Sequence, residues 1–235
     1  TLDRPHAKQA DFIDSLAKRK VVVAGRRGGK TRGFSIFSAK KFLAGRRILY
    51  AGPKQEQTDP FWENCVRYLM PLIEQKRVYK NETRRILAWM KPGAKLTVSD
   101  EDVTIEEIDD LSFSRIRAKT AYNADTLRGD WGDIVILDEY SLMSPDVDTV
   151  TAPMMLDTNG DLIYGGTPKR RNHFYIKYQQ AVADTTGRRA AWHFTSHDNP
   201  YLSREALEDI TEDLTAEMYQ QEIMAEFLEN EGVVF

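Results

Sequence analysis

The sequence predicts an α/β fold in which a mostly parallel central sheet has helices on both faces. Short apolar runs alternate along the chain with stretches of helical periodicity, as is typical of parallel βαβ units. The longest apolar runs, at 21–24 and 134–137, are short and continuous, as buried parallel strands are. The 235 residues, 41% of them hydrophobic, suffice for one large α/β domain but not for two side by side.

The first predicted elements are a strand, a helix and a strand. Residues 20–25 (KVVVAG) form a buried strand, and residues 31–44 form a helix with Ile36, Ala39 and Leu43 on its apolar face. Residues 47–52 form the second strand, which ends before Pro53.

The middle of the chain, residues 76–120, contains short stretches of alternating polarity. We expect these stretches to add antiparallel strands to the sheet. The acidic run at 106–110 (EEIDD) is expected on the solvated face of a hairpin rather than in a metal cluster. The predicted stretches lie at 78–79, 86–89, 96–98, 103–105 and 113–116.

The last predicted strands are followed by an acidic helical tail. Residues 134–137, 162–164 and 190–194 are expected as strands, and residues 203–227 as helix with two apolar stripes. One stripe comprises Leu207, Ile210, Leu214 and Met218, and the other comprises Tyr219, Ile223 and Phe227.

Charge is distributed unevenly along the chain. Residues 203–235 hold ten acids and one base, a balance of -9, so the net charge of -3 leaves about +6 on residues 1–202. Seven bases and no acid lie within residues 18–32, a composition that attracts phosphates or nucleic acid.

Several protein classes do not fit this composition. No apolar run approaches the roughly 18 residues of a membrane span, and Cys65 is the one cysteine, so no internal disulfide can form. No secretory pattern opens the sequence, so we expect an intracellular protein. Because the chain begins with Thr1 rather than Met, a fragment of a longer protein is also expected.

The strongest motif joins the first strand to the first helix. Glycines there let backbone N–H groups surround phosphate oxygens, while Lys30 reaches the β and γ phosphates and the Thr31 hydroxyl joins a Mg²⁺ shell. Ala24 replaces the first glycine of the usual pattern, and a glycine-rich turn on a basic surface is the alternative. The predicted nucleotide-binding loop comprises Gly25, Arg26, Arg27, Gly28, Gly29, Lys30 and Thr31.

Two further motifs follow predicted strands. ILDEYS delivers Asp138 and Glu139 to the sheet edge at which open α/β sheets bind ligands. Asp138 is expected to hold Mg²⁺ through water, and Glu139 to orient and deprotonate the attacking water. Thr167, in GGTP after the strand at 162–164, is expected to sense the γ-phosphate. The alternatives are an acidic pair that caps a strand and an ordinary tight turn.

In order and content these motifs resemble the ATPase domain of the large terminase subunit, the DNA-packaging motor of tailed bacteriophages. AGRRGGKT is similar to the family's arginine-containing Walker A loop, ILDEYS to its Walker B motif and GGTP to its coupling motif. RPHAKQ, with Gln9, is placed like its adenine-recognition segment, and YAGPKQEQTDPFW like its strand-two motif. AEFLENEGVVF resembles the junction to a nuclease domain, for which no residues remain.

The resemblance implies a P-loop NTPase of the additional-strand, catalytic-glutamate type. The expected division is an ATPase core at 1–197, a helical lid at 198–228 and the start of the junction at 229–235. The implied activity is hydrolysis of ATP with Mg²⁺, coupled to translocation of double-stranded viral DNA into the procapsid. The DNA would be gripped independently of its sequence.

The resemblance also implies partners and a place of action. We expect copies of the chain in a ring, a pentamer by family resemblance, together with the portal protein and the small terminase subunit. The chain would act in the host cytoplasm, docked transiently on the procapsid portal. No membrane partner is expected.

Arg128 and Arg26 are alternative arginine fingers. The family places an arginine like Arg128 in the segment before Walker B, where it reaches a neighbouring subunit's γ-phosphate; Arg26 would act within its own subunit. A structural salt bridge is the alternative for Arg128. For the whole chain, a helicase-type translocase fragment and an ATP-gated nucleic-acid-binding switch remain alternative functions.

Overall fold

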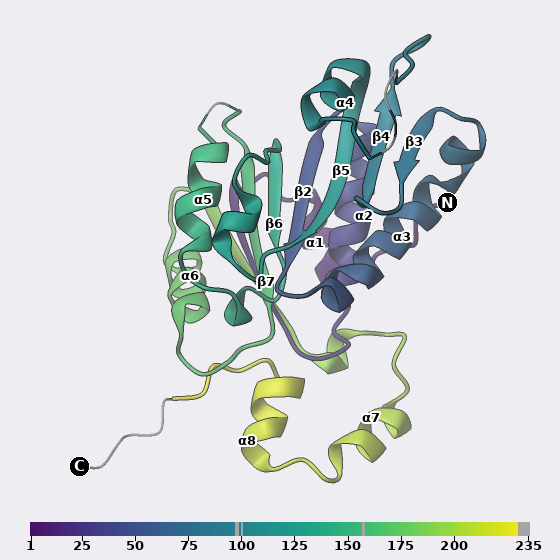
Figure 1. Cartoon of the computed structure of the whole chain (residues 1–235). Coiled ribbons are helices and arrows are strands. Elements are labelled where there is room, and N and C mark those ends of the chain that lie inside the picture. The colour runs from purple at the N-terminus through teal and green to yellow at the C-terminus, as the bar shows by residue number, and fades with distance from the viewer. Residues whose placement is uncertain (97–98, 100, 157, 230–235) are drawn as a thin grey trace.

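The computed structural model describes residues 1–96, 99, 101–156 and 158–229 (Figure 1). In this part of the chain eight strands form one sheet in the order β3-β4-β5-β2-β6-β7-β1-β8. Neighbouring strands from β5 to β8 are parallel, whereas β4 is antiparallel to both β3 and β5. The predicted α/β class with a mostly parallel sheet is confirmed.

The strands are β1 (Arg19–Ala24), β2 (Arg47–Gly52), β3 (Val78–Asn81), β4 (Ile86–Met90), β5 (Ser112–Thr120), β6 (Ile134–Leu137), β7 (Asp161–Gly166) and β8 (Arg189–Phe194). The α-helices are α1 (Ala7–Asp14), α2 (Lys30–Leu43), α3 (Gln55–Glu74), α4 (Ile105–Leu111), α5 (Val147–Met154), α6 (His173–Val182), α7 (Arg204–Thr211) and α8 (Ala216–Met218).

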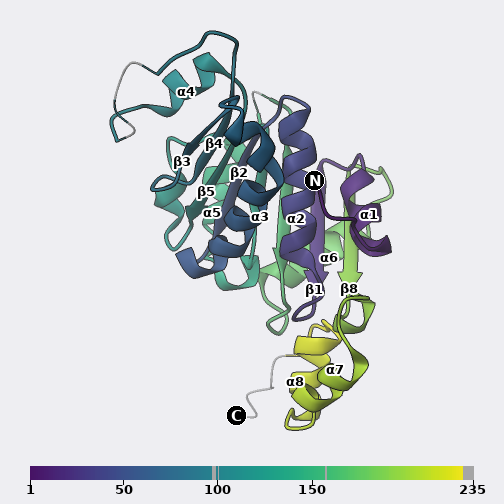
Figure 2. The same ribbon diagram turned by 90° about the vertical axis from the view of Figure 1, so that its right-hand side faces the viewer.

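Helices cover both faces of the sheet, and alternate strand residues supply the two cores. In β1, Val22 and Ala24 face the core under α1, α2 and α3, whereas Val21 and Val23 face the core under α5 and α6. This alternation is the period of two that a strand imposes on its side chains. Figure 2 shows α1, α2 and α3 in front of the sheet and α6 behind it.

Three parallel strands end at the edge of the sheet that carries the predicted motifs. Strand β7 lies between β1 and β6, with Val23 opposite Gly166 and Leu137 opposite Tyr164. The loops that follow these three strands therefore leave the same edge, beside the C-terminal helices α7 and α8 (Figures 1 and 2).

The segment before β5 differs from the expectation. Residues 103–105, predicted as a strand, lead into helix α4, because Thr104 and Glu107 form a capping box that starts it. The run at 106–110 consequently belongs to a helix, so the predicted hairpin is wrong, although Glu106, Glu107 and Asp110 are exposed as expected. The stretch at 113–116 is part of β5, which pairs parallel with β2 as well as antiparallel with β4. Of the stretch at 96–98, residues 97–98 lie outside the described residues.

The acidic tail is less helical than predicted. Helix α7 ends at Thr211, Thr215 caps the short helix α8 with its side chain, and a π-helical turn η4 (Tyr219–Ile223) follows. Each threonine hydroxyl competes with the regular helical hydrogen bonds, so one continuous helix over 203–227 does not form. Residues 230–235, which hold most of the predicted junction, lie outside the described residues. No helix among the described residues is long and apolar enough to cross a membrane.

Candidate functional site

The glycine-rich loop between β1 and α2 has the backbone of an anion cradle. Gly29, the residue before the helix, has φ 89°, and Arg27 also has a positive φ of 58°. Because Gly29 lacks a side chain, nothing at the cap accepts from the first-turn amides of α2, and that turn holds no acidic residue. Free N–H groups and the positive end of the helix dipole together favour a phosphate at this point.

Lys30 lies between the two carboxylates that follow β6. Its Nζ donates to Asp138 Oδ1, and it donates to Glu139 Oε1 over 2.8 Å. Burial by itself lowers the pKa of Lys30, but the adjacent carboxylates of Asp138 and Glu139 outweigh burial and raise it above the ordinary value. The lysine is therefore fully charged at neutral pH.

Asp138 accepts hydrogen bonds on both carboxylate oxygens. Oδ1 accepts from Lys30 and from the backbone N–H of Glu139 over 2.9 Å, while Oδ2 accepts from Thr31 Oγ1 over 3.2 Å and from the Tyr50 hydroxyl over 2.5 Å. Asp138 itself is only 2% exposed. A buried carboxylate with this set of donors is held in one orientation.

Glu139 occupies a strained turn. Its φ of 53° lies in the left-handed region that few residues other than glycine adopt, and its carbonyl accepts from Leu142 N over 2.9 Å. The turn points the Glu139 carboxylate along the cavity described below, a quarter exposed, whereas Asp138 stays buried. The two adjacent acids thus have different surroundings.

The donor set fits Mg²⁺ bound together with a nucleotide. Thr31 and Asp138 supply hard oxygen atoms within hydrogen-bond distance of each other, and Mg²⁺ typically takes one or two such protein ligands beside phosphate and water. No cluster of three or more His, Cys, Asp or Glu side chains that could hold a metal occurs in the described ranges. A site with few protein ligands therefore depends on phosphate to complete it.

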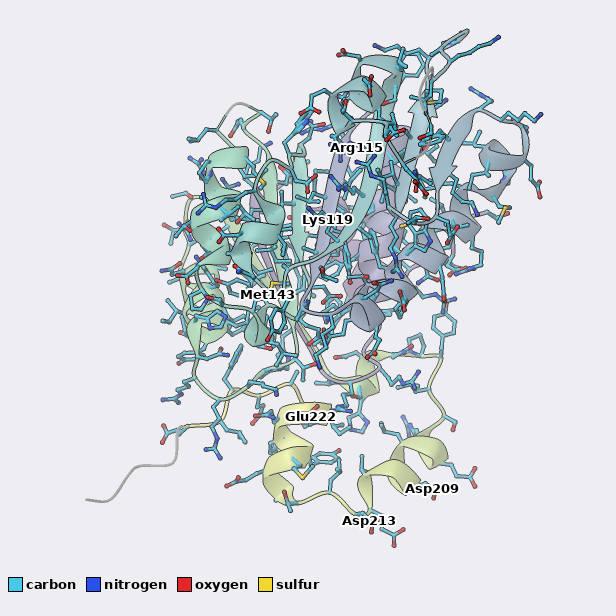
Figure 3. The ribbon with its side chains drawn as sticks, viewed as in Figure 1. Arg115, Lys119, Met143, Asp209, Asp213 and Glu222 are labelled. Carbon is cyan, nitrogen blue, oxygen red and sulfur yellow. The ribbon has the colours of Figure 1, made fainter. Side chains whose placement is uncertain are left out.

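A cavity of about 1000 Å³ lies between the glycine-rich loop and the predicted lid. Loop residues 25–32, Glu139 and Thr167 line its sheet side. Figure 3 shows Glu222 on the part of the lid nearest the sheet, and Asp209 and Asp213 on the part farthest from it. The lid side of the cavity is mostly apolar and includes Leu202, Leu207, Leu214 and Met218.

Contacts from the C-terminal region hold the glycine-rich loop, and sequence reasoning missed them. Ser196 Oγ donates to the Arg26 carbonyl over 2.5 Å, and Asn199 donates to the Arg27 carbonyl over 2.6 Å. The Arg26 guanidinium donates to Glu222 Oε2 over 2.5 Å, and this carboxylate raises the pKa of Arg26. These polar residues follow a predicted strand or lie in an acidic tail, and no local pattern distinguishes them from surface residues.

Gln9 and His6 lie behind the loop rather than in the cavity. Gln9 is buried and donates to the Gly29 carbonyl over 2.7 Å, while His6 Nε2 lies 3.3 Å from the Gly28 carbonyl. Burial lowers the pKa of His6, so the ring is neutral at physiological pH. The two side chains form a capping box at the start of α1 and brace the loop from its far side.

Thr167 and Arg128 lie in different places. Thr167 lines the cavity, and its carbonyl accepts from Ser141 Oγ over 2.8 Å, which joins the loop after β7 to the turn after β6. Arg128 follows the short 3₁₀ turn at 124–127, is 70% exposed and pairs with Asp125. It does not line the cavity of its own chain.

Fold and site together define an α/β protein whose glycine-rich loop, between β1 and α2, has the backbone of an anion cradle. By sequence, the chain is 27% identical to the terminase large subunits of Thermus virus P23-45 and Thermus phage G20c over 177 residues. The match covers 73% of this chain and 35% of each relative, so the chain spans about a third of their length. No model of a protein family matches it.

By fold, the chain is similar to solved ATPase domains. The large terminase ATPase domain of Thermus phage P74-26 has a TM-score of 0.76 at 24% identity, covering 96% of this chain and 94% of that one. The large terminase of another thermophilic bacteriophage, solved in complex with ADP, has a TM-score of 0.66 at 15% identity, covering 95% and 53%. The predicted resemblance to the large terminase ATPase domain is confirmed.

Proposed function

We propose that the chain binds ATP with Mg²⁺ and hydrolyses it. The observation that carries this proposal is the convergence of Lys30 with Asp138 and Glu139, more than a hundred residues apart in sequence, at the mouth of a glycine-rich loop. One cation can bind phosphate, one buried carboxylate can hold Mg²⁺ and one partly exposed carboxylate can orient the attacking water, and these are tasks in phosphoryl transfer to water.

Each group has a distinct role in this proposal. The first-turn amides of α2 and Lys30 bind the phosphates, and Thr31 with Asp138 would hold Mg²⁺, which neutralises charge that develops on the phosphoryl oxygens. Glu139 orients a water and accepts its proton. Thr167 responds to the γ-phosphate, and its link to Ser141 would pass the change to the turn that carries Glu139.

The topology supports the additional-strand, catalytic-glutamate type. Strand β7 separates β1, which leads into the loop, from β6, which ends in Asp138 and Glu139. Residues 1–197 then act as the ATPase core, and residues 198–228 as a lid over the nucleotide. The place of α7 and α8 beyond the edge of the sheet supports this division (Figure 2).

We further propose that hydrolysis drives double-stranded viral DNA into a procapsid. The similarity to large terminase subunits supports this step. The motor would be a ring of copies, a pentamer by family resemblance, docked in the host cytoplasm on the portal protein and served by the small terminase subunit. Contacts with phosphates would dominate the grip on DNA, so affinity should fall steeply with salt.

Steady-state turnover of ATP tests the hydrolytic step. We expect Glu139→Gln to lower the rate by about 10²–10⁴-fold while a fluorescent ATP analogue still binds, because the glutamate acts on water and not on the phosphates. Glu74→Gln, an exposed carboxylate at the end of α3, is the matched control and should turn over at the wild-type rate. Nucleotide binding without any Glu139-dependent turnover would favour an ATP-gated switch instead.

A further inference from the structure

Tyr50 is a buried residue beside the candidate metal site. It lies on β2, directly opposite Ile136 of β6, so its hydroxyl reaches the residue that follows β6 at the sheet edge. The side chain is fully buried, and the hydroxyl donates to Asp138 Oδ2 over 2.5 Å. The tyrosine belongs to the YAGPKQEQTDPFW segment, to which the proposed hydrolytic mechanism assigns no role.

The ring of Tyr50 cannot swing away from Asp138. It stacks on Phe61 of α3 with ring centroids 3.7 Å apart and an interplanar angle of 4°. Phe61 is also fully buried within the core under α2 and α3. The hydroxyl is therefore held in place by close packing on the ring as well as by its hydrogen bond.

The donors to Asp138 fall into two groups. Lys30 and Thr31 belong to the glycine-rich loop and are the residues that the proposed function assigns to phosphate and Mg²⁺. The Tyr50 hydroxyl comes from the sheet and the Glu139 N–H from the turn at the sheet edge. The proposed function assigns neither group to phosphate or Mg²⁺. When phosphate and metal engage the loop residues, the sheet donors keep the carboxylate oriented.

We propose that Tyr50 is a positioning residue for the metal site: its hydroxyl fixes Asp138 Oδ2 so that the carboxylate presents its remaining lone pairs toward Thr31 and the metal. Groups that hydrogen-bond to a metal ligand set its orientation, and their loss typically costs about 10–100-fold in metal affinity. This inference rests on the proposed function, because it assigns Mg²⁺ to Asp138.

The test compares nucleotide binding with and without Mg²⁺. A fluorescent ADP analogue is titrated into wild type, Tyr50→Phe and Tyr140→Phe, once in Mg²⁺ and once in EDTA. Tyr140→Phe is the matched control, because it also removes a hydrogen bond between a fully buried tyrosine and an aspartate, here Asp148 at 3.0 Å. Thermal unfolding of both variants shows whether the deletions cost similar stability.

We expect Tyr50→Phe to bind the analogue about tenfold more weakly in Mg²⁺ and nearly unchanged in EDTA, whereas Tyr140→Phe keeps the wild-type ratio. The inference would be overturned, in favour of a packing role, if Tyr50→Phe lost affinity for the analogue equally in Mg²⁺ and in EDTA. It would also be overturned if Mg²⁺ raised the affinity of Tyr50→Phe by the same factor as that of wild type. A wild type that binds no analogue, or binds it equally in both buffers, would instead remove the proposed nucleotide and Mg²⁺ site and this inference with it.

Discussion

Asp109 illustrates how burial changes the role of a residue. It belongs to the acidic run at 106–110 but is only 7% exposed, and its carboxylate accepts two hydrogen bonds from Arg115, which is fully buried. Arg47 approaches the same carboxylate at 3.1 Å. Because Arg115 belongs to β5 and Arg47 to β2, Asp109 links α4 to both strands. An acid that looks solvated in the sequence is therefore a buried residue.

Replacing Asp109 should destabilise the fold far more than replacing its neighbour. Asp109→Ala leaves the buried Arg115 without its counter-ion, which we expect to lower the free energy of unfolding by about 3 kcal/mol or more. Asp110→Ala, at an exposed position of the same helix, should stay within about 0.5 kcal/mol of wild type. Urea unfolding measures both, and equal effects would contradict the structural role of the pair.

Lys20 is a buried cation on β1. Its ammonium donates to the Ser15 carbonyl over 2.5 Å and lies over the rings of Phe12 and Phe37. Burial lowers the pKa of Lys20 to about 8. The folded chain therefore releases this proton at a lower pH than the unfolded chain does.

This shift predicts a pH dependence of stability with a definite sign. Between about pH 8 and the ordinary lysine value of 10.5, the unfolded chain binds the proton and the folded chain does not, so stability rises with pH. The free energy of unfolding of wild type minus that of Lys20→Met should increase by up to about 3 kcal/mol from about pH 7 to 10.5. The subtraction cancels the contributions of other titrating groups. A difference in the free energy of unfolding that does not change with pH would refute the lowered pKa of Lys20.

At the scale of elements, an ion pair and close backbone contact join the turn η4 of the lid to the glycine-rich loop. The Arg26–Glu222 ion pair is open to solvent on the arginine side, which is 74% exposed, so it contributes less than about 1 kcal/mol. The backbone of the loop at Gly25 is in close contact with the backbone of η4. A Cβ placed on Gly25 would lie 2.5 Å from the Ile223 carbonyl oxygen and 2.9 Å from that of Glu222.

Gly25→Ala should therefore loosen the lid more than Glu222→Gln does. Carbonyl groups of η4 cannot rotate away as a side chain can, so the loop and the turn must separate, whereas loss of a surface ion pair leaves the packing intact. Hydrogen exchange of the amides at 216–224 measures the difference. Faster exchange in Glu222→Gln than in Gly25→Ala would reverse this ranking of the two contacts.

For the whole molecule, the position of Arg128 raises the question of a second copy. The described chain forms a single sheet with one candidate nucleotide site, and Arg128 lies outside that cavity, exposed. If Arg128 acts as an arginine finger, it therefore completes the site of a neighbouring copy and not its own. Arg26 already lines its own cavity and is the alternative.

Mixing two inactive variants distinguishes these arrangements. Arg128→Ala keeps Glu139 but offers no finger, and Glu139→Gln keeps the finger but cannot activate water. If Arg128 acts between copies, an equal mixture should regain up to about a quarter of the wild-type ATPase rate, and the wild-type rate per chain should rise with concentration. Arg128→Ala with full activity at every dilution would show that the arginine is structural.

The sequence by itself determined the features that depend on neighbouring residues. The glycine-rich loop needs its glycines and Lys30 in one continuous run, and the apolar strand at 134–137 carries Asp138 and Glu139 directly behind it. Strand β2 and strand β6 have the predicted bounds for the same reason. Local periodicity and composition are sufficient for such elements, because the interactions that define them are short in sequence.

Only the tertiary structure decided which distant residues support the site. Tyr50 reaches Asp138 because β2 pairs with β6, and Ser196 and Asn199 reach the loop because β8 pairs with β1. The register of strand pairing brings these residues together, and no local pattern encodes it. Asp109 looked solvated and proved buried for the same reason: hydrogen bonds and burial depend on partners far along the chain, which only the completed sheet brings close.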